Sequence, residues 1–242
     1  MTRQLVSAVA LVLGLWLLVG QPVSGLLRSR RDVPVLRRYR DSVVRQWVLT
    51  AVAVLVTLVG VGAPPEALGL VPRWERELYY LPGVLQGIGV GALAVVALRW
   101  DRRRRPGRSL LEALLRPVSA LMPSTRPERW AYAGVAFTAG ITEELLYRGW
   151  LVWFLALAAP VGGYQGALIV SSVAFGLGHA YQGPRGVVLA GVAGLGLALL
   201  AFSTGSILLP VLLHVLVDLR VLLLLPRRER VGVGPTAGLA AP

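Results

Sequence analysis

Seven long apolar runs, separated by short polar or arginine-rich stretches, dominate the hydropathy pattern of this chain. They lie at about Leu5–Val19, Val43–Gly62, Leu81–Trp100, Trp130–Ala159, Gly166–Tyr181, Val187–Phe202 and Ile207–Leu225. Several approach the roughly 20 residues that an α-helix needs to cross the hydrocarbon core of a bilayer. The pattern predicts an all-α fold: a polytopic transmembrane helix bundle with about seven crossings.

The composition supports this assignment. The 242 residues are 55% hydrophobic and only 15% charged, whereas a soluble domain carries roughly a quarter charged residues. The chain has no cysteine, which excludes disulfides, thiolate metal sites and cysteine nucleophiles. All 25 basic residues are arginine, and together with the abundance of alanine, glycine, leucine and valine this indicates a GC-rich bacterial genome.

The net charge of +13 comes from arginine blocks beside the apolar runs, at residues 28–40, 102–108 and 227–230. Such blocks are typical of cytoplasmic loops rather than of a nucleic-acid-binding surface. They place the C-terminus in the cytoplasm and the N-terminus outside the cell inner (plasma) membrane. An even number of crossings must then separate the third block from residue 130, so we expect residues 130–159 to cross once. The first run lacks a clear cleavage site, which favours an uncleaved anchor over a signal peptide.

Six of the ionisable side chains inside the apolar runs are candidates for a site, because burial there is costly and indicates either function or a structural pair. They are Glu143, Glu144, Arg148, His179, His214 and Asp218. Glu144 and Arg148 are four residues apart on one helical face, with Glu143 turned roughly 100° away. Taken singly, each group is also explained by ordinary helix packing. Three helices that each present such a group instead indicate a polar site in the bundle interior. This set suits a water activated by Glu and His, a divalent metal such as Zn²⁺, or proton transfer.

The same residues resemble the motifs of the CPBP intramembrane proteases, which include the type II CAAX prenyl endopeptidases and bacteriocin self-immunity relatives. The pattern of that family is E-E-x3-R, F-x3-H and H-x3-N/D. This chain has Glu143-Glu144-x3-Arg148, Phe175-x3-His179 and His214-x3-Asp218 in the same order. Tyr147 stands where relatives often have phenylalanine, and Asp218 where asparagine is commoner.

The resemblance implies a membrane-embedded endopeptidase that acts on a protein or peptide substrate, in contact with lipid and not with nucleic acid. Glu143 would be the general base, and Glu144 and Arg148 would position the site. His179 would hold the water or a metal, and His214 and Asp218 would bind the oxyanion or metal. Glu143, His179, His214 and Asp218 are thus the candidate ligands of a Zn²⁺ or other divalent ion.

The chain then divides into four parts. Residues 1–108 form three N-terminal transmembrane helices, 109–127 an interfacial amphipathic helix and linker, 128–225 the catalytic core, and 226–242 a basic, disordered tail. In the linker, Glu112 and Arg116 have the spacing of a helical ion pair, and Thr125 and Glu128 that of a capping box. Glu143 lies about 20 Å along its helix, whereas His179 lies near the cytoplasmic end of its run. Either a kink or re-entrant stretch around Gly134–Gly140 brings the two residues level, or the number of crossings differs from seven.

Three other functions stay open on the sequence alone. A catalytically silent scaffold or immunity protein would keep the motifs without cleaving. A proton- or metal-coupled transporter would need a second polar layer. A serine protease of the rhomboid type could use Ser171, Ser172, Ser203 or Ser206, but no G-x-S-G context surrounds these residues.

Overall fold

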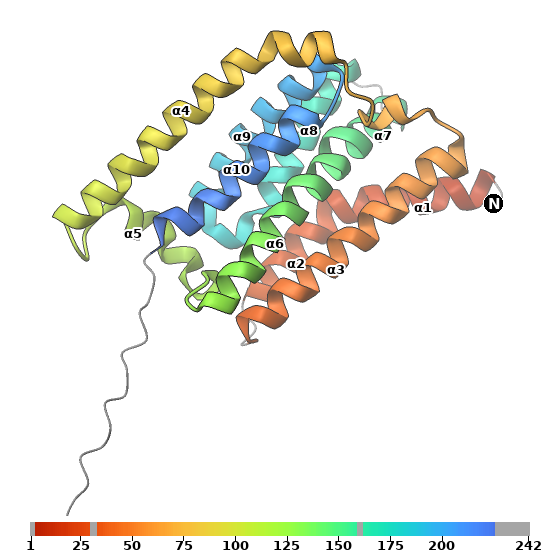
Figure 1. Cartoon of the computed structure of the whole chain (residues 1–242). Helices are drawn as coiled ribbons and strands as arrows, with labels where there is room; N and C mark the ends of the chain where they lie inside the picture. The colour runs from red at the N-terminus through yellow and green to blue at the C-terminus, as the bar shows by residue number, and fades with distance from the viewer. Residues whose placement is uncertain (1–2, 30–32, 159–161, 226–242) are drawn as a thin grey trace, which may run out of the picture.

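The computed structural model describes residues 3–29, 33–158 and 162–225, and over these residues it contains helices and no strand. The helices lie side by side as one bundle (Figure 1), which confirms the predicted all-α fold. Four helical stretches are long and apolar enough to cross a membrane: Arg3–Leu27, Val35–Val61, Trp74–Arg104 and Ala180–Thr204. The protein is therefore a membrane protein, and the count of seven crossings stays a prediction. The tail predicted at 226–242 lies outside the described residues.

Each predicted apolar run coincides with a helical rod. The N-terminal rods are α1 (Arg3–Leu15) with η1 (Trp16–Gly20) and α2 (Gln21–Ser29), then α3 (Val35–Val54) with η2 (Leu55–Val61), and, after η3 (Pro65–Leu68), α4 (Trp74–Arg104). The linker holds α5 (Leu110–Leu115) and η4 (Arg116–Leu121). The remaining rods are α6 (Arg126–Glu143) with η5 (Glu144–Leu151) and α7 (Val152–Ala158), then α8 (Gly163–Gly178), η6 (Ala180–Gln182), α9 (Gly183–Thr204) and α10 (Leu208–Leu224).

Both α5 in the linker and α6 after it begin with a capping box. Thr125 and Glu128 form the predicted box that starts α6. At the start of α5, Glu112 does not pair with Arg116 as its spacing suggested. Its carboxylate instead accepts a hydrogen bond from the backbone N–H of Ser109. The α-helix ends at Leu115 because Pro117 lacks an N–H, and the chain continues as the tighter 3₁₀ helix η4.

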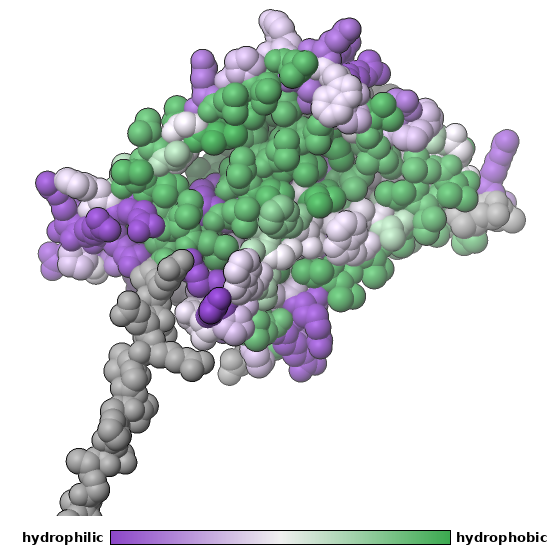
Figure 2. Space-filling view, in the orientation of Figure 1, coloured by the Kyte–Doolittle hydropathy of each residue, from purple (hydrophilic) through white to green (hydrophobic). Residues whose placement is uncertain are grey.

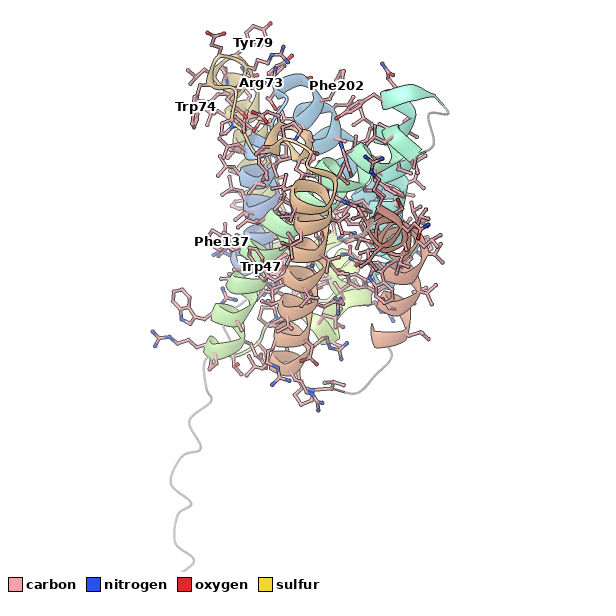
Figure 3. All side chains as sticks on the ribbon, turned by 90° about the vertical axis from the view of Figure 1, so that its right-hand side faces the viewer. Trp47, Arg73, Trp74, Tyr79, Phe137 and Phe202 are labelled. Carbon is pink, nitrogen blue, oxygen red and sulfur yellow. The ribbon has the colours of Figure 1, made fainter. Side chains whose placement is uncertain are left out.

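The surface of the bundle has an apolar flank and polar ends, as Figure 2 shows. Large exposed aromatic side chains lie near both ends. Trp74 and Tyr79 are exposed where α4 begins (Figure 3), and Trp100 and Trp130 are exposed at the arginine-rich end. Aromatic residues of this kind are enriched at the two interfaces between membrane and water.

Arginine side chains tie the end of α10 to its neighbours. Arg99 of α4 donates to the carbonyl of Leu223, Arg102 to that of Leu224, and Arg129 of α6 to that of Leu222. These carbonyls have no partner within their own helix, and cations there also stabilise the helix dipole. The contacts hold α4, α6 and α10 together at the arginine-rich end.

The predicted break at Gly134–Gly140 does not occur, because α6 runs without interruption from Arg126 to Glu143. Helix length, not a kink, brings the motifs level. The rod of α6, η5 and α7 is about 50 Å long, and Glu143 lies roughly halfway along it. The returning helix α8 has 16 residues and is only about 24 Å long. It therefore ends at the depth of Glu143, and His179 follows directly.

Candidate active site

The first motif straddles the junction between α6 and a π-helical segment, η5. Such wider turns are rare and frequently occur at functional sites. Glu144 and Arg148 on η5 are both buried, and the guanidinium Nη1 donates to Glu144 Oε1 at 2.8 Å. The same guanidinium lies 4.1 Å over the ring of Phe175. The pair thus forms one fixed charged unit beneath α8.

His214 of α10 is held by the same carboxylate. Its Nδ1 lies 2.6 Å from Glu144 Oε1, and because an ionised carboxylate only accepts hydrogen bonds, Nδ1 carries a proton. This fixes the orientation of the ring. The opposite nitrogen, Nε2, faces Glu143 Oε2 at 3.9 Å and Asp218 Oδ2 at 3.8 Å. A buried carboxylate that orients an imidazole in this way is the usual device for setting its tautomer.

Glu143 has a partner that the sequence analysis missed. Gln46 on α3 is buried and donates from Nε2 to Glu143 Oε1 at 2.7 Å. Its neighbour Arg45 also interacts electrostatically with Glu143. The sequence carried a signal for both, since they form a polar pair inside the second apolar run, but that run was interpreted only as a generic membrane helix.

The second motif joins the cluster through Phe175. The ring of Phe175 lies 4.7 Å from that of His179 and 5.8 Å from that of His214. His179 Nδ1 is hydrogen-bonded to the backbone carbonyl of Phe175 at 2.8 Å. This contact does not involve the other ring nitrogen, Nε2. Asp218 interacts electrostatically with His214, Glu143 and His179. The structure therefore brings all six predicted residues into one neighbourhood.

Burial is uneven across this cluster. Glu143, Glu144, Arg148 and His214 are buried, whereas His179 is only partly buried and the side chain of Asp218 is 34% exposed. The cluster therefore opens toward its surroundings on the side of His179 and Asp218.

The donor types suit a zinc ion, but their spacing does not enclose one. Ligand atoms around tetrahedral zinc lie about 2.0–2.2 Å from the metal and so roughly 3.3–3.6 Å from each other. The two gaps around His214 Nε2 are 3.9 and 3.8 Å. In the described part of the chain, no group of three or more His, Asp or Glu side chains is arranged to hold a metal ion.

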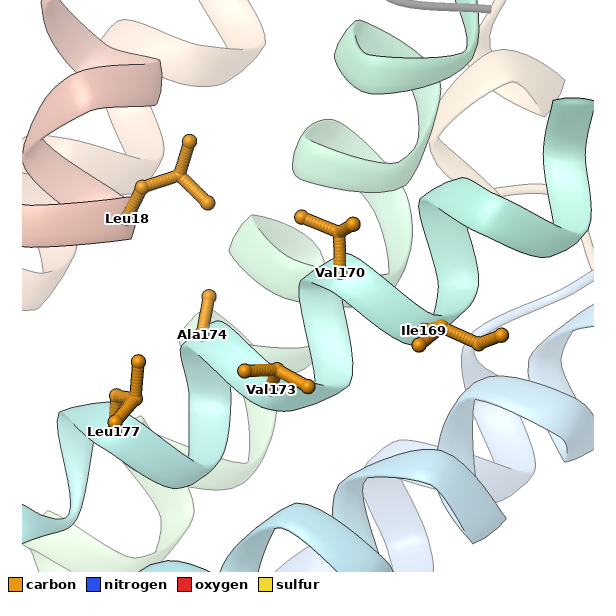
Figure 4. Close-up of a pocket in the computed structure, with 6 residues that line it drawn as sticks. All are labelled: Leu18, Ile169, Val170, Val173, Ala174 and Leu177. Carbon is orange, nitrogen blue, oxygen red and sulfur yellow. The ribbon is translucent and has the colours of Figure 1, made fainter. Parts of the chain in front are cut away.

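A separate cavity of about 190 Å³ lies between η1 and α8 (Figure 4). Its lining is aliphatic: Leu18, Ile169, Val170, Val173, Ala174 and Leu177. With no ionisable side chain in its wall, this cavity is not the polar site. Of the four serines considered, Ser171 donates to the carbonyl of Tyr147 and Ser172 to that of Leu168, so these two hydroxyls are bonded to backbone.

Comparison with known proteins gives a family for the part of the chain that carries the motifs. Residues 125–220, about two fifths of the chain, match the model of the family described as "Type II CAAX prenyl endopeptidase Rce1-like". No curated protein and no solved structure matches. The match contains all three motifs, and the family is one of membrane proteases. This match is consistent with the resemblance to the CPBP proteases that the motifs predicted: residues 125–220 are similar to the Rce1-like type II CAAX prenyl endopeptidases, a protease family.

Proposed function

We propose that this protein is an endopeptidase that hydrolyses a peptide bond of a protein or peptide substrate inside the membrane, through a water activated by Glu143. The observation that carries the proposal is the gap between Glu143 Oε2 and His214 Nε2. At 3.9 Å the two atoms are too far apart for a direct hydrogen bond. A water molecule bonded to both at about 2.8 Å fits between them.

The steps need only side chains of this chain. Glu143 accepts a proton from the water while the water oxygen attacks the substrate carbonyl carbon. The tetrahedral intermediate then collapses, the C–N bond breaks, and Glu143 passes its proton to the leaving nitrogen. The products are a carboxylic acid and an amine. A carboxylate placed within reach of the water is the first requirement for such a base.

His214 is the proposed donor to the oxyanion. As an imidazolium it donates from Nε2 to the developing negative charge, while Glu144 and Arg148 hold the ring in place through Nδ1. Asp218 can assist only in its protonated form, because an ionised carboxylate repels an oxyanion. In a water-poor site fixed donors of this kind act strongly, and removing one typically costs about 10²–10³-fold in kcat.

The proposed setting is a bacterial inner (plasma) membrane, with the arginine-rich end in the cytoplasm and the N-terminus outside. The arginine blocks support this orientation, and the exposed aromatic residues at both ends support insertion across the membrane.

The test uses purified protein in detergent or liposomes and a quenched-fluorescence peptide library. Wild type and Glu143→Gln are compared, each with and without a chelator. Cleavage by wild type and loss of cleavage in folded Glu143→Gln is the expected result. Loss of wild-type activity with chelator, restored by Zn²⁺, would bring a metal into the mechanism. Absence of cleavage by a folded wild type across the library would favour a catalytically silent scaffold instead.

A further inference from the structure

The polar cluster is not confined to the segment that matches the protease family. Gln46 lies on α3, in the N-terminal part of the chain and far from residues 125–220 in sequence. It is nevertheless buried, with 5% of its surface exposed, and contacts the proposed base directly. An uncharged amide buried at this depth is costly unless both its ends are bonded.

Both ends of this amide have partners. The Nε2 group donates to Glu143 Oε1 at 2.7 Å, and Oε1 of the amide accepts from the Thr142 hydroxyl at 3.4 Å. The orientation of the amide follows from chemistry, since a carboxylate can only accept and so must face the NH₂ group. The Thr142 hydroxyl has a single proton, and its shorter bond, 2.7 Å, is to the carbonyl of Thr138. The 3.4 Å contact to Gln46 is therefore the weaker of the two, and the bond from Nε2 to Glu143 is the one that orients the amide. The amide is therefore fixed relative to the helix that carries Glu143.

The bond to Oε1 leaves the other oxygen of Glu143 for chemistry. With Oε1 held by Gln46, the carboxylate presents Oε2 toward His214 Nε2 across the 3.9 Å gap. A carboxylate with neither oxygen held could rotate about its terminal torsion, which is broad and soft. Gln46 removes that freedom, and a base displaced by about 1 Å can lose roughly 10²-fold in rate.

We propose that Gln46 is a positioning residue of the peptidase: its amide orients the Glu143 carboxylate so that Oε2 faces the water between Glu143 and His214. This inference rests on the proposed function. It also makes the N-terminal helices part of the catalytic unit, because α3 supplies a hydrogen bond that residues 125–220 cannot supply.

Three variants at this position test the role. Gln46→Met keeps a similar length and removes the donor, and Gln46→Glu keeps the shape but presents an oxygen to Glu143. Thr50→Val is the matched control, since Thr50 is buried one turn further along α3 and is not among the partners of Glu143. Each protein is checked for folding by size-exclusion chromatography and thermal unfolding, and then assayed for kcat and KM at mildly alkaline pH.

A positioning role predicts that kcat falls about tenfold to hundredfold in Gln46→Met, with KM changed less than about twofold. Gln46→Glu should lose at least as much, although it is nearly isosteric, whereas a residue that serves only packing would tolerate this change best. Thr50→Val should keep both constants. Wild-type kcat in folded Gln46→Met, or an effect on KM alone, would overturn the role of Gln46. A folded wild type that cleaves nothing would overturn the proposed function and this role with it.

Discussion

A single methyl group added to α9 should disturb the charged pair beneath the site. At Gly194, an added Cβ would lie 2.9 Å from Arg148 Nη2 and 2.9 Å from Phe175 Cδ1. Neither neighbour can withdraw cheaply, because the guanidinium is bonded to Glu144 and lies over the Phe175 ring. At Gly196, two residues further along the same helix, an added Cβ would meet no atom within 4 Å.

These two glycines give a matched pair of variants, Gly194→Ala and Gly196→Ala. Both gain the same helix propensity, about 1 kcal/mol, so the difference between them isolates the cost of overpacking. Overpacking typically costs about 1–3 kcal/mol. We therefore expect Gly194→Ala to unfold with a free energy about 1–3 kcal/mol below that of Gly196→Ala.

The assay is reversible unfolding in mixed micelles with increasing SDS, followed by circular dichroism. The same samples are tested for peptide cleavage, where Gly194→Ala should lose about tenfold in kcat because Arg148 is displaced from Glu144. Gly196→Ala should cleave at the wild-type rate. Unfolding free energies of the two variants that agree within about 0.5 kcal/mol would refute the packing argument, since an added Cβ clashes at buried Gly194 and meets nothing at exposed Gly196.

Three further outcomes follow from the described contacts. Arg148→Met should lower the free energy of unfolding by about 3–5 kcal/mol, measured in the same SDS titration, because it removes one partner of a buried ion pair and leaves the Glu144 carboxylate with His214 alone. Asp218→Asn should keep or raise kcat for peptide cleavage, because an amide donates to an oxyanion without a proton of its own; a hundredfold loss would show that the carboxylate itself is needed. The backbone N–H groups of Thr125 and Ser124 lower the pKa of Glu128. The cap that Glu128 forms therefore contributes its full stabilisation above the pKa of the unfolded chain, about 4.3. This stabilisation is lost as the pH falls through the lower pKa of the folded state. Amide hydrogen exchange at the start of α6 should accelerate in that pH range in wild type and not in Glu128→Gln.

The sequence was sufficient to predict the helical class and the residues of the three motifs. Apolar periodicity and length determine where a membrane helix forms, and the structure has a rod at each predicted run. The pairing of Glu144 with Arg148 also followed from spacing, because residues four apart meet on any helix. These features are local, and local sequence carries them.

Contacts between different helices could not be predicted from the hydropathy pattern. Gln46 and Glu143 are 97 residues apart, and nothing in either run indicates which face meets which. The failed pairing of Glu112 with Arg116 has a local cause instead: the backbone N–H of Ser109 donates to the carboxylate of Glu112, and the α-helix ends before Pro117. The predicted break at Gly134–Gly140 was wrong because the run lengths were taken from hydropathy, which does not locate the end of α8.

The rods that carry the motifs are also those that do not qualify as ordinary membrane spans. The rod of α6, η5 and α7 is interrupted by Glu143, Glu144 and Arg148, and α8 and α10 have 16 and 17 residues, shorter than the roughly 20 that cross a bilayer. Both properties are consequences of holding a polar site. Charges buried at mid-depth lower the hydropathy of the helix that carries them, and α8 must end early for His179 to lie level with Glu143. A longer α8 would be long enough to count as a membrane span, but it would carry His179 away from the depth of Glu143. The weak membrane-span signal of these three rods therefore follows from their buried charges and short helices.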